Sequence, residues 1–477
     1  MTAAVPSLRL RRQTTEGRMK VSNYHARITG SDYAAMADLV TKYKVTVARH
    51  TVEKVAQGYR VDAHASDEQI RALEAAGYKV ERLEDAQIQG VARQKEKRTS
   101  TVGALTREAL SVAAGTGYLD VAHIEAALAA ESEAPNDAFT TLIKLPNETW
   151  EKRVCHALKI GKGSGAGRVG IYFLGGVHAR EWGSPDILVN FVQLLASAYR
   201  TNTDITIGSR TFTAAQIKSV VEKKDVYVFP QANPDGRNYS MLTEPMWRKN
   251  RRPAPAGHTQ SQCVGVDVNR NYDFLWDFPK YFDPKSPIAN STDPCDHDVY
   301  IGPAATSEPE TKNAVWMFDN FPHIRYFVDL HSYSEDILYN WGDDIDQSAD
   351  PAMNFQNPAY DGKRGIANDK AYREYIAAED KKIAVNLANE MRDAIKASRG
   401  RTYKTEQSMS LYPTAGTSDD YAFSRHLVDA KKAKVFSYTI EWGSPQNPTP
   451  FHPPYPEMKQ IIDEVTSGLL AFCISAQ

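Results

Sequence analysis

Residues 170–182 read GIYFLGGVHAREW, and this stretch carries the strongest structural signal in the chain of 477 residues. Residues 170–176 form an almost continuous apolar run, as expected for a strand buried on both faces of a parallel sheet. His178 and Glu181 follow directly, and their spacing directs both side chains to one side of a helical or tight turn. Polar groups just beyond the carboxyl end of such a strand are typical of functional sites in open α/β sheets.

Three other short apolar runs repeat this pattern of a buried strand followed by polar residues. They are VYVFP at 226–230, YFVDL at 326–330 and VFSYTI at 435–440. The first run is followed by a turn sequence, NPDG, and the other two are followed by His331 and Glu441. The runs alternate with helix-like segments, so we predict an α/β domain over residues 117–477.

His178, Glu181 and His331 together have the composition of a catalytic zinc site. Two imidazoles and one carboxylate occupy three positions around a tetrahedral ion and leave the fourth open for water. A lone His–Glu pair at this spacing is more often a surface ion pair, and the chain has 12 histidines. The position of both histidines after predicted strands favours the metal site, although with 12 histidines in the chain a chance coincidence stays open.

Composition excludes several other classes of protein. The chain has 57 basic and 59 acidic residues, and its net charge of −2 gives none of the basic excess typical of nucleic-acid binding. The hydrophobic fraction of 42% and the charged fraction of 24% are those of a globular chain. No apolar run approaches the ~18 residues that a membrane span needs. We therefore expect neither a nucleic-acid partner nor a membrane span.

The first 116 residues separate into three segments. Residues 1–20 are expected to form a disordered tail, in which no secretory signal peptide is visible. Residues 21–85 show strand and helix patterns in the order β-α-β-β-α-β, the split-βαβ arrangement of a small α+β domain. The capping-box pair Ser66 and Gln69 marks the start of its second helix. Residues 86–116 include the basic stretch ARQKEKRTSTVG at 92–103 and are predicted to be a linker that proteases can cut.

Several motifs, in this order, resemble those of the zinc metallocarboxypeptidases of the pancreatic carboxypeptidase A and B type. The motifs are GGVHAREW at 175–182, NPDG at 233–236, WRKNR at 247–251, GVDVNRN at 265–271, DLHSY at 329–333 and the late Glu441. The resemblance covers roughly residues 117–477. It implies a mixed, mostly parallel sheet of about eight strands flanked by helices. It also implies one Zn²⁺ per chain, with His178, Glu181 and His331 as its ligands.

The same resemblance implies roles for residues around the metal. Glu441 would deprotonate the attacking water and pass the proton to the leaving amine. Arg251 would polarise the scissile carbonyl. Asp267 would orient the first zinc histidine. Asn269 and Arg270 would bind the C-terminal carboxylate of a peptide, because a guanidinium pairs with a carboxylate through two parallel hydrogen bonds.

Three more residues match substrate contacts of this family. Arg180 and Tyr412 match residues that touch the substrate further back and cover the bound C-terminal residue. Asp419 matches the floor of the side-chain pocket, where an acid goes with C-terminal Lys or Arg. A shift of one residue in this loop would exchange Asp419 with Asp420, so the basic preference depends on the register.

The resemblance further implies a disulfide and a zymogen. Cys263 and Cys295 match a family disulfide, which favours an oxidising, secreted location and leaves a cytoplasmic one open. Cys155 and Cys473 have no evident partner and are interpreted as buried small hydrophobic residues. Residues 21–85 match, in topology only, the pro-domain that covers the active-site cleft of this family, and the basic linker would then be the activation site. A stably attached accessory domain is the alternative.

We therefore expect a monomeric zinc exopeptidase that releases single C-terminal amino acids from peptides or proteins and is activated by another protease. The alternatives are a peptidase that trims cell-wall muropeptides, a deacylase with a similar zinc pair, and a catalytically inactive binding module on the same fold. The intact Asn269–Arg270 pair argues against the muropeptide peptidase. The presence of Glu441, of Arg251 and of all three ligands argues against the inactive module.

Overall fold

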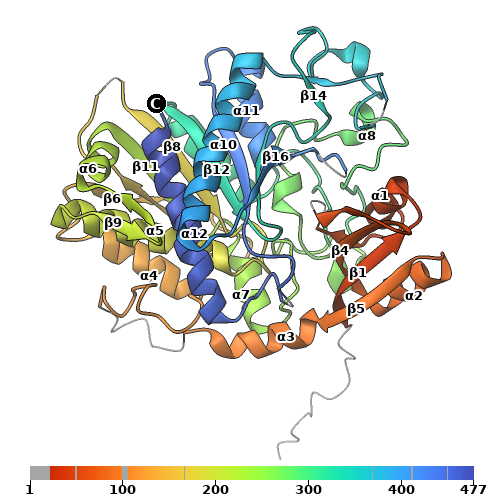
Figure 1. The fold of residues 1–477 in the computed structure, drawn as a ribbon, viewed down its shortest axis with the longest axis horizontal. Helices are drawn as coiled ribbons and strands as arrows, with labels where there is room; N and C mark the ends of the chain where they lie inside the picture. The colour runs from red at the N-terminus through yellow and green to blue at the C-terminus, as the bar shows by residue number, and fades with distance from the viewer. Residues whose placement is uncertain are drawn as a thin grey trace, which may run out of the picture.

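The computed structural model describes residues 22–48, 51–98, 106–165, 167–367, 369–409, 412–447 and 449–477. The tail predicted for residues 1–20 lies outside the described residues. A small N-terminal unit with its own sheet precedes a large body that is built on a mixed sheet flanked by helices (Figure 1). The α/β fold class predicted from the sequence is thus confirmed.

The large sheet contains eight strands in the order β16-β13-β17-β12-β8-β11-β7-β6. Their bounds are β6 Thr140–Lys144, β7 His156–Ile160, β8 Val169–Gly175, β11 Lys224–Phe229, β12 Ile324–His331, β13 Asp336–Tyr339, β16 Lys404–Gln407 and β17 Phe436–Glu441. The central strands β17, β12, β8 and β11 run parallel, while β13, β7 and β6 add antiparallel pairs. These central strands are the four apolar runs of the sequence, so the mixed, mostly parallel sheet is confirmed.

Helices cover both faces of this sheet. One face is covered by α4 Val121–Ser132, α5 Gly183–Thr201, α6 Ala214–Lys223, α10 Ala378–Arg399 and α12 Tyr455–Ser475. The other face is covered by α9 Pro309–Asn320 and α11 Ser418–Val428. The remaining elements of the body are α7 Pro234–Leu242, α8 Phe278–Tyr281, and two small sheets of β9 Ile205–Ile207 with β10 Arg210–Phe212 and β14 Asp346–Gln347 with β15 Glu374–Tyr375. Among the described residues no helix combines the length and apolarity that crossing a membrane requires.

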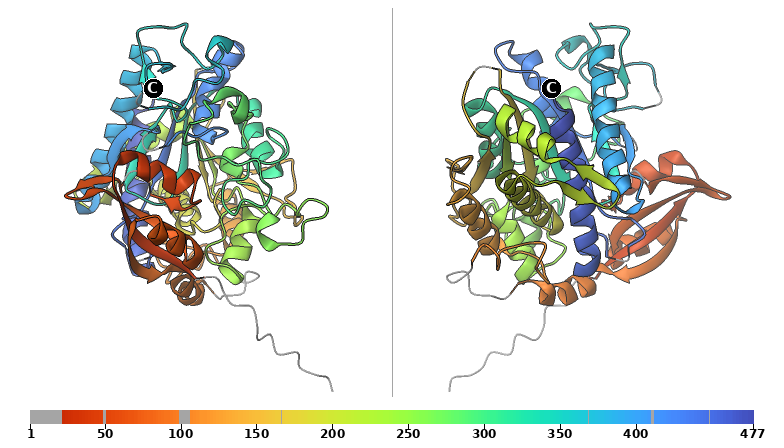
Figure 2. Two further views of the ribbon diagram at one scale, coloured as in Figure 1. Left: turned by 90° about the vertical axis from the view of Figure 1, so that its right-hand side faces the viewer. Right: turned by 60° about the vertical axis from the view of Figure 1, so that its left-hand side comes forward.

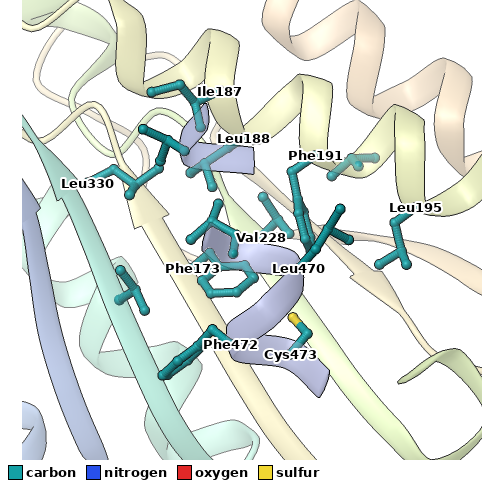
Figure 3. Close-up of a cluster of buried hydrophobic side chains, with 14 of the residues drawn as sticks. Phe173, Ile187, Leu188, Phe191, Leu195, Val228, Leu330, Leu470, Phe472 and Cys473 are labelled. Atoms are coloured by element: carbon teal, nitrogen blue, oxygen red, sulfur yellow. The ribbon is translucent and has the colours of Figure 1, made fainter. Parts of the chain in front are cut away.

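The central strands are continuously apolar because their side chains alternate between two cores. Phe173 of β8 and Val228 of β11 belong to one core, and their chain neighbours Tyr172 and Phe229 belong to the other. Figure 3 shows Phe173 and Val228 beside side chains of α5 and α12, among them Leu470. The sheet is therefore fixed on both faces, and its carboxyl edge is a rigid support for the residues that follow each strand.

The N-terminal unit follows the predicted order of elements, with one additional short strand. It contains β1 Asn23–Gly30, α1 Tyr33–Thr41, β2 Thr46–Val47, β3 Glu53–Val55, β4 Gly58–Ser66, α2 Asp67–Ala75 and β5 Lys79–Asp85. The strands are ordered β2-β4-β1-β5, and β3 pairs with β4. The capping box of Ser66 and Gln69 begins α2 as predicted. Figure 2 shows this unit, in red and orange, as a separate lobe against the large body.

The segment that was expected to be a linker is ordered at both ends. It begins with α3 Ala86–Arg93, and the backbone of Lys97 forms an isolated β-bridge with Tyr118. Further on, Leu110 and Val112 are buried in the main core. Residues 99–105, which include part of the basic stretch, lie outside the described residues.

Candidate active site

The turn after β8 brings His178 and Glu181 to the carboxyl edge of the large sheet. Gly176 has a φ of +63°, a left-handed conformation that favours glycine. A Cβ at Gly176 would lie 3.0 Å from the Cα of Gln231, so the chain also passes too close to its neighbour for a side chain. The amide of Glu181 donates to the carbonyl of His178 at 3.2 Å and closes the turn. Both side chains then emerge on the same side.

β12 and β17 contribute His331 and Glu441 at the same edge. The two strands are parallel, and His331 lies opposite Glu441 in their register. Residues opposite one another in register point to the same face of a sheet. β12 also pairs in parallel with β8. The carboxyl ends of neighbouring parallel strands therefore meet at one place, as expected for sites in α/β sheets.

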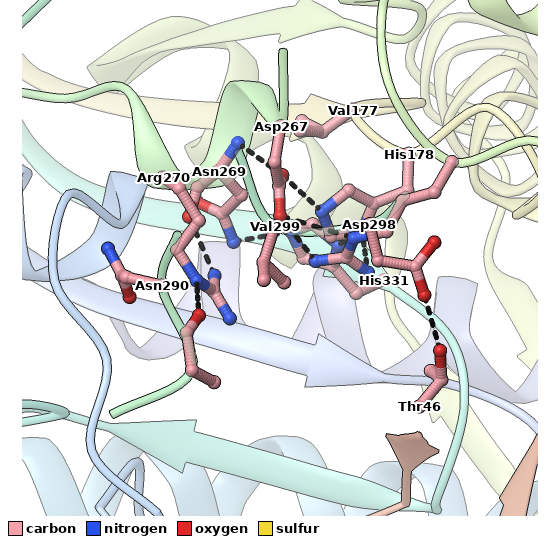
Figure 4. Close-up of polar contacts among 12 residues, drawn as sticks. Thr46, Val177, His178, Asp267, Asn269, Arg270, Asn290, Asp298, Val299 and His331 are labelled. Atoms are coloured by element: carbon pink, nitrogen blue, oxygen red, sulfur yellow. Dashed lines mark hydrogen bonds and ion pairs between the residues drawn. The ribbon is translucent and has the colours of Figure 1, made fainter. Parts of the chain in front are cut away.

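His178, Glu181 and His331, hereafter the metal cluster, converge at this edge. The Nδ1 atoms of the two histidines lie 3.0 Å apart. The carboxylate of Glu181 lies 2.8 Å from Nδ1 of His178 and 3.1 Å from Nδ1 of His331. All three side chains are buried, with exposed fractions of 5%, 2% and 1%. Figure 4 shows the two histidine rings side by side.

This arrangement fits a zinc ion. Ligand atoms bound to one tetrahedral zinc at ~2.0–2.1 Å lie roughly 3.3 Å from each other, which is close to the separations in the metal cluster. Burial opposes ionisation of Glu181, but the two histidines outweigh burial and lower the pKa of its carboxyl. Within the described residues one other group of side chains is compact enough to hold a metal, and it contains Cys263 and Cys295, which form a disulfide.

A buried carboxylate lies behind each histidine of the metal cluster. Nε2 of His178 lies 3.2 Å from Asp267, and Nε2 of His331 lies 3.0 Å from Asp329. Carboxylates in this position fix the orientation and tautomer of a ligand imidazole, which leaves Nδ1 for the metal. Burial acts to raise the pKa of Asp267, but Arg248 and His178 outweigh burial and hold this pKa below its ordinary value.

The arginine beside the metal cluster is Arg248, which corrects the expectation for Arg251. Nη1 of Arg248 lies 3.3 Å from Nδ1 of His178. The guanidinium of Arg251 instead lies 3.8 Å from the centre of the Tyr239 ring, and its Nε lies 3.6 Å from Glu151. The backbone of this segment is neither helix nor strand, so no periodicity in the sequence reveals which arginine faces the site.

Asn269 and Arg270 line the same cavity as the metal cluster. Their side chains are buried, with exposed fractions of 7% and 6%. Nε of Arg270 donates to the carbonyl of Ala289 at 2.8 Å, and Nη1 donates to the carbonyl of Asn269 at 2.7 Å. These bonds hold the guanidinium against the cavity wall, where it is suited to pair with an anion.

Asp419 also lines this cavity, whereas Asp420 does not. The carboxylate of Asp419 accepts hydrogen bonds from the hydroxyl groups of Ser408 at 3.1 Å and Thr439 at 3.2 Å. Asp420 accepts from the amide of Asn340 at 2.8 Å. Of the two aspartates, Asp419 is therefore the one that faces the cavity of the metal cluster.

Arg180 lies at the wall of the cavity and is almost completely buried. Its exposed fraction is 1%. Its guanidinium lies 4.5 Å from the centre of the Phe451 ring, and its Nη1 lies 3.6 Å from Asp298. Asp298 also accepts a hydrogen bond from the hydroxyl of Thr46, so it links Arg180 to the docked N-terminal unit (Figure 4).

The N-terminal unit reaches into the cavity of the metal cluster. Thr46, Val47 and Ala48 line this cavity together with the metal ligands, and its volume is about 100 Å³. Tyr412, also at the cavity wall, packs against the hydrophobic core of the N-terminal unit. The docked unit thus limits the space beside the metal cluster and contacts one of the expected substrate-binding residues.

The cysteines have the predicted arrangement. Cys263 and Cys295 form a disulfide. Cys155 and Cys473 are free thiols, and both are buried in the hydrophobic cores.

Asp329 and Arg248 are two residues near the metal cluster that were not predicted from the sequence. Asp329 precedes His331 by two residues, and a strand repeats every two residues, so the alternation of β12 alone places both side chains on one face. No comparable signal existed for Arg248, because it lies in an irregular segment with several other basic residues.

Comparison with known proteins points to one family. The family model described as zinc carboxypeptidase matches residues 127–468. Carboxypeptidase B from Homo sapiens is 30% identical over 294 residues, which cover 61% of this chain and 55% of that protein. Carboxypeptidase A4 from Mus musculus is 28% identical over 281 residues, which cover 59% of this chain and 54% of that protein. The chain thus spans little more than half the length of these curated relatives.

Two solved structures share the fold over nearly the whole chain. Carboxypeptidase A from Helicoverpa armigera has a TM-score of 0.67 at 17% identity, with 96% of this chain and 99% of that chain covered. Thrombin activatable fibrinolysis inhibitor has a TM-score of 0.66 at 20% identity, with 95% and 98% covered. At these identities the likeness establishes the fold.

Proposed function

Because the chain belongs to the zinc carboxypeptidase family, we propose that it is a zinc-dependent exopeptidase that removes single C-terminal amino acids from peptides or proteins. The observation that carries this proposal is that the metal cluster shares one cavity with Glu441 and the Asn269–Arg270 pair. A metal, a base and a receptor for a carboxylate are the parts that C-terminal hydrolysis needs.

The proposed reaction assigns one task to each polar group. Zinc held by the metal cluster supplies Lewis acidity, which lowers the pKa of water and polarises a carbonyl oxygen. Glu441 is the general base, which takes the proton from water and delivers it to the leaving amine. Arg248 donates hydrogen bonds to the carbonyl oxygen on which negative charge develops, a role supported by its position 3.3 Å from Nδ1 of His178. Asp267 keeps His178 in the orientation that presents Nδ1.

In this proposal, different residues hold the terminal carboxylate, the preceding residues and the C-terminal side chain of the substrate. Asn269 and Arg270 receive the terminal carboxylate, and Arg180 and Tyr412 flank the residues that precede it. Asp419 lies in the cavity with a buried carboxylate, which supports a preference for C-terminal Lys or Arg because a desolvated acid pairs best with a cation.

A panel of matched peptides tests this function and its specificity. Peptides ending in Lys or Arg should be cleaved with a kcat/KM about tenfold or more above those ending in Phe or Leu, the effect of one charge-assisted hydrogen bond. A chelator should abolish all cleavage, and Asp419→Asn should remove the preference while Asp420→Asn retains it. Equal cleavage of peptides with amidated C-termini would refute the exopeptidase proposal, and a preference for Phe or Leu would refute the role of Asp419.

The two arginines of the WRKNR motif should differ sharply in their effect on activity. Arg248→Ala is expected to lower kcat by ~10²–10³, the usual effect of removing one donor to a developing oxyanion. Arg251→Ala should change kcat much less, because Arg251 lies outside the cavity of the metal cluster. Steady-state kinetics on one good peptide decide the matter, and a larger loss for Arg251→Ala would restore the original assignment.

We further propose that the chain is made as an inhibited zymogen and that its disulfide suits an oxidising, secreted location. Inhibition is supported by Thr46, Val47 and Ala48 at the cavity wall and by the packing of Tyr412 against the N-terminal core. In this proposal the catalytic domain acts as a monomer, and a separate protease removes the N-terminal unit by cutting the basic stretch at 92–103.

Cleavage of the basic stretch should raise activity. We expect limited digestion with a protease specific for Lys and Arg to increase kcat/KM by about tenfold or more, because a buried site admits substrate only in the fraction of molecules that are open. A variant with glutamine at Arg93, Lys95, Lys97 and Arg98 is the matched control and should resist both cleavage and activation. Cleavage without any gain in activity would favour a stably attached accessory domain.

A further inference from the structure

Asp329 is a buried carboxylate to which the proposed reaction gives no direct part. It precedes His331 on β12, and its exposed fraction is 0%. Its Oδ2 lies 3.0 Å from Nε2 of His331 and accepts a hydrogen bond from the hydroxyl of Ser418 at 2.6 Å. Its Oδ1 has no hydrogen-bond partner among the described residues. Burial of a carboxylate in this state is costly, so stability alone is a poor reason for its presence.

Ser418 links this carboxylate to the substrate side of the cavity. Ser418 begins α11 and is fully buried. Its amide donates to Oδ1 of Asn269 at 2.8 Å, while its hydroxyl donates to Asp329. Hydrogen bonds therefore run without interruption from Asn269 through Ser418 and Asp329 to His331.

We propose that Asp329 is a positioning residue that fixes the metal ligand His331 and, through Ser418, couples it to the carboxylate-binding residue Asn269. The proposal rests on the proposed function. With the proton of the His331 imidazole held on Nε2 by Asp329, Nδ1 presents its lone pair to the metal. Coupling of this kind is reciprocal, so zinc binding also orders Asn269, and a bound substrate carboxylate tightens zinc binding.

The zinc dissociation constant tests this proposal without an activity measurement. Competition with a chromophoric chelator should show that Asp329→Asn weakens zinc binding by ~10–100-fold, the range for loss of a partner behind a ligand histidine. Ser418→Ala should weaken it less. Asp225→Asn is the matched control, because Asp225 is a buried carboxylate on β11 whose Oδ2 lies 3.0 Å from Nε2 of His323, a histidine outside the metal cluster.

Unchanged zinc affinity in Asp329→Asn would overturn the positioning role, as would an equal loss in Asp225→Asn. The melting temperatures of the metal-free proteins separate the positioning role from a general loss of stability. Asp329→Asn should lower zinc affinity even where the metal-free variant melts at the same temperature as wild type. Failure of the wild-type protein to bind zinc would instead refute the proposed function.

A different observation concerns the face by which the small sheet docks on the body. Ile28 and Ala63 point into the core of the N-terminal unit, so His25 and His64 point to the opposite face. The two histidines are opposite each other in the β1–β4 register, and their rings stack with centroids 5.2 Å apart. Both are buried, with exposed fractions of 1% and 2%.

This histidine pair is surrounded by groups from both sides of the interface. His64 lies 3.1 Å by its Nδ1 from the hydroxyl of Tyr333, and its ring centroid lies 4.9 Å from that of Phe451. The charged and titratable groups that face the pair are Arg180, Asp298, His452 and Tyr333 of the body, Glu84 of β5, and the Arg27–Asp62 ion pair of the small sheet. Burial lowers the pKa of His64, and His25, Arg180 and His452 lower it further, so docking favours the neutral imidazole.

We also propose that acidification loosens this interface, because protonation of His64 puts a cation against the stacked ring of His25 and near Arg180. The direction of the pH effect on docking follows from the linkage between docking and protonation of His64. Docking holds the pKa of His64 below its free value of about 6.5, so docking is strongest above that pH and weakens as the pH falls. Each histidine that protonates on release weakens docking by up to about tenfold per pH unit.

The proposed loosening of the interface is tested by hydrogen exchange of the full chain at about pH 7.5 and about pH 5.5, corrected for the intrinsic exchange rates. Peptides that contain Thr46–Ala48, Tyr333 and Phe451 should lose protection at the lower pH by about tenfold or more. The double variant His25→Gln/His64→Gln should remain protected at both values, and His258→Gln, at an exposed histidine, should behave like wild type.

Unchanged protection of the wild-type protein between the two pH values would overturn the proposal, whatever the variants do. An equal loss of protection in the double variant would do the same. The measurement does not depend on catalysis, so its outcome is separate from that of the cleavage experiment on zymogen activation.

Discussion

Replacing Glu441 with glutamine should lower kcat by ~10²–10⁴ and leave the zinc content at one ion per chain. The amide has the shape of the carboxylate but cannot accept the proton of water. Glu441 lies opposite His331 in the β12–β17 register, so the variant changes the base without removing a ligand. Steady-state kinetics and metal analysis of the same sample measure both results.

A control on an outer strand of the same sheet makes this prediction specific. Glu406→Gln, on β16, removes a carboxylate outside the cavity and should keep wild-type kcat. Activity of Glu441→Gln within about threefold of wild type would show that the proton goes elsewhere, since a general base contributes far more than that.

Removal of one metal ligand should have a comparably large effect by a different route. His331→Ala leaves one imidazole and one carboxylate in the metal cluster, fewer than the three protein ligands of a catalytic zinc site. The purified variant should therefore contain little zinc and show no measurable exopeptidase activity. Glu441→Gln, by contrast, should keep its zinc, so the two inactive variants differ in metal content.

His323→Ala is the matched control for the metal ligand. His323 immediately precedes β12, so it lies at the opposite end of the strand that carries His331, and its Nε2 lies 3.0 Å from Asp225. The control should lose stability but retain zinc and activity. Full zinc occupancy in His331→Ala would contradict the assignment of the metal cluster.

The sequence predicted the central strands of the large sheet but not its outer ones. β8 and β12 are buried on both faces, so their apolar runs stand out without reference to the rest of the fold. β16 and β6 lie at the two edges, are short, and carry polar residues such as Lys404 and Thr141. Their strand conformation depends on the neighbours with which they pair, which a local pattern does not contain.

The same distinction applies to the site. His178, Glu181, His331 and Glu441 follow regular strands, and the topology of parallel strands brings them together. The WRKNR motif does not reveal which arginine faces the cavity, because that segment has no regular conformation from which side-chain direction follows. The charge of the basic stretch near residue 97 predicts a solvated linker. In the structure, however, Lys97 forms an isolated β-bridge with Tyr118.

The most direct test of the account is to locate the metal in crystals of the zinc-loaded protein by anomalous diffraction on both sides of the zinc edge. The metal cluster predicts one zinc peak per chain, at ~2.0–2.2 Å from Nδ1 of His178, Nδ1 of His331 and the carboxylate of Glu181. The absence of a peak at this position in protein that retains zinc, or a peak at another site alone, would contradict it.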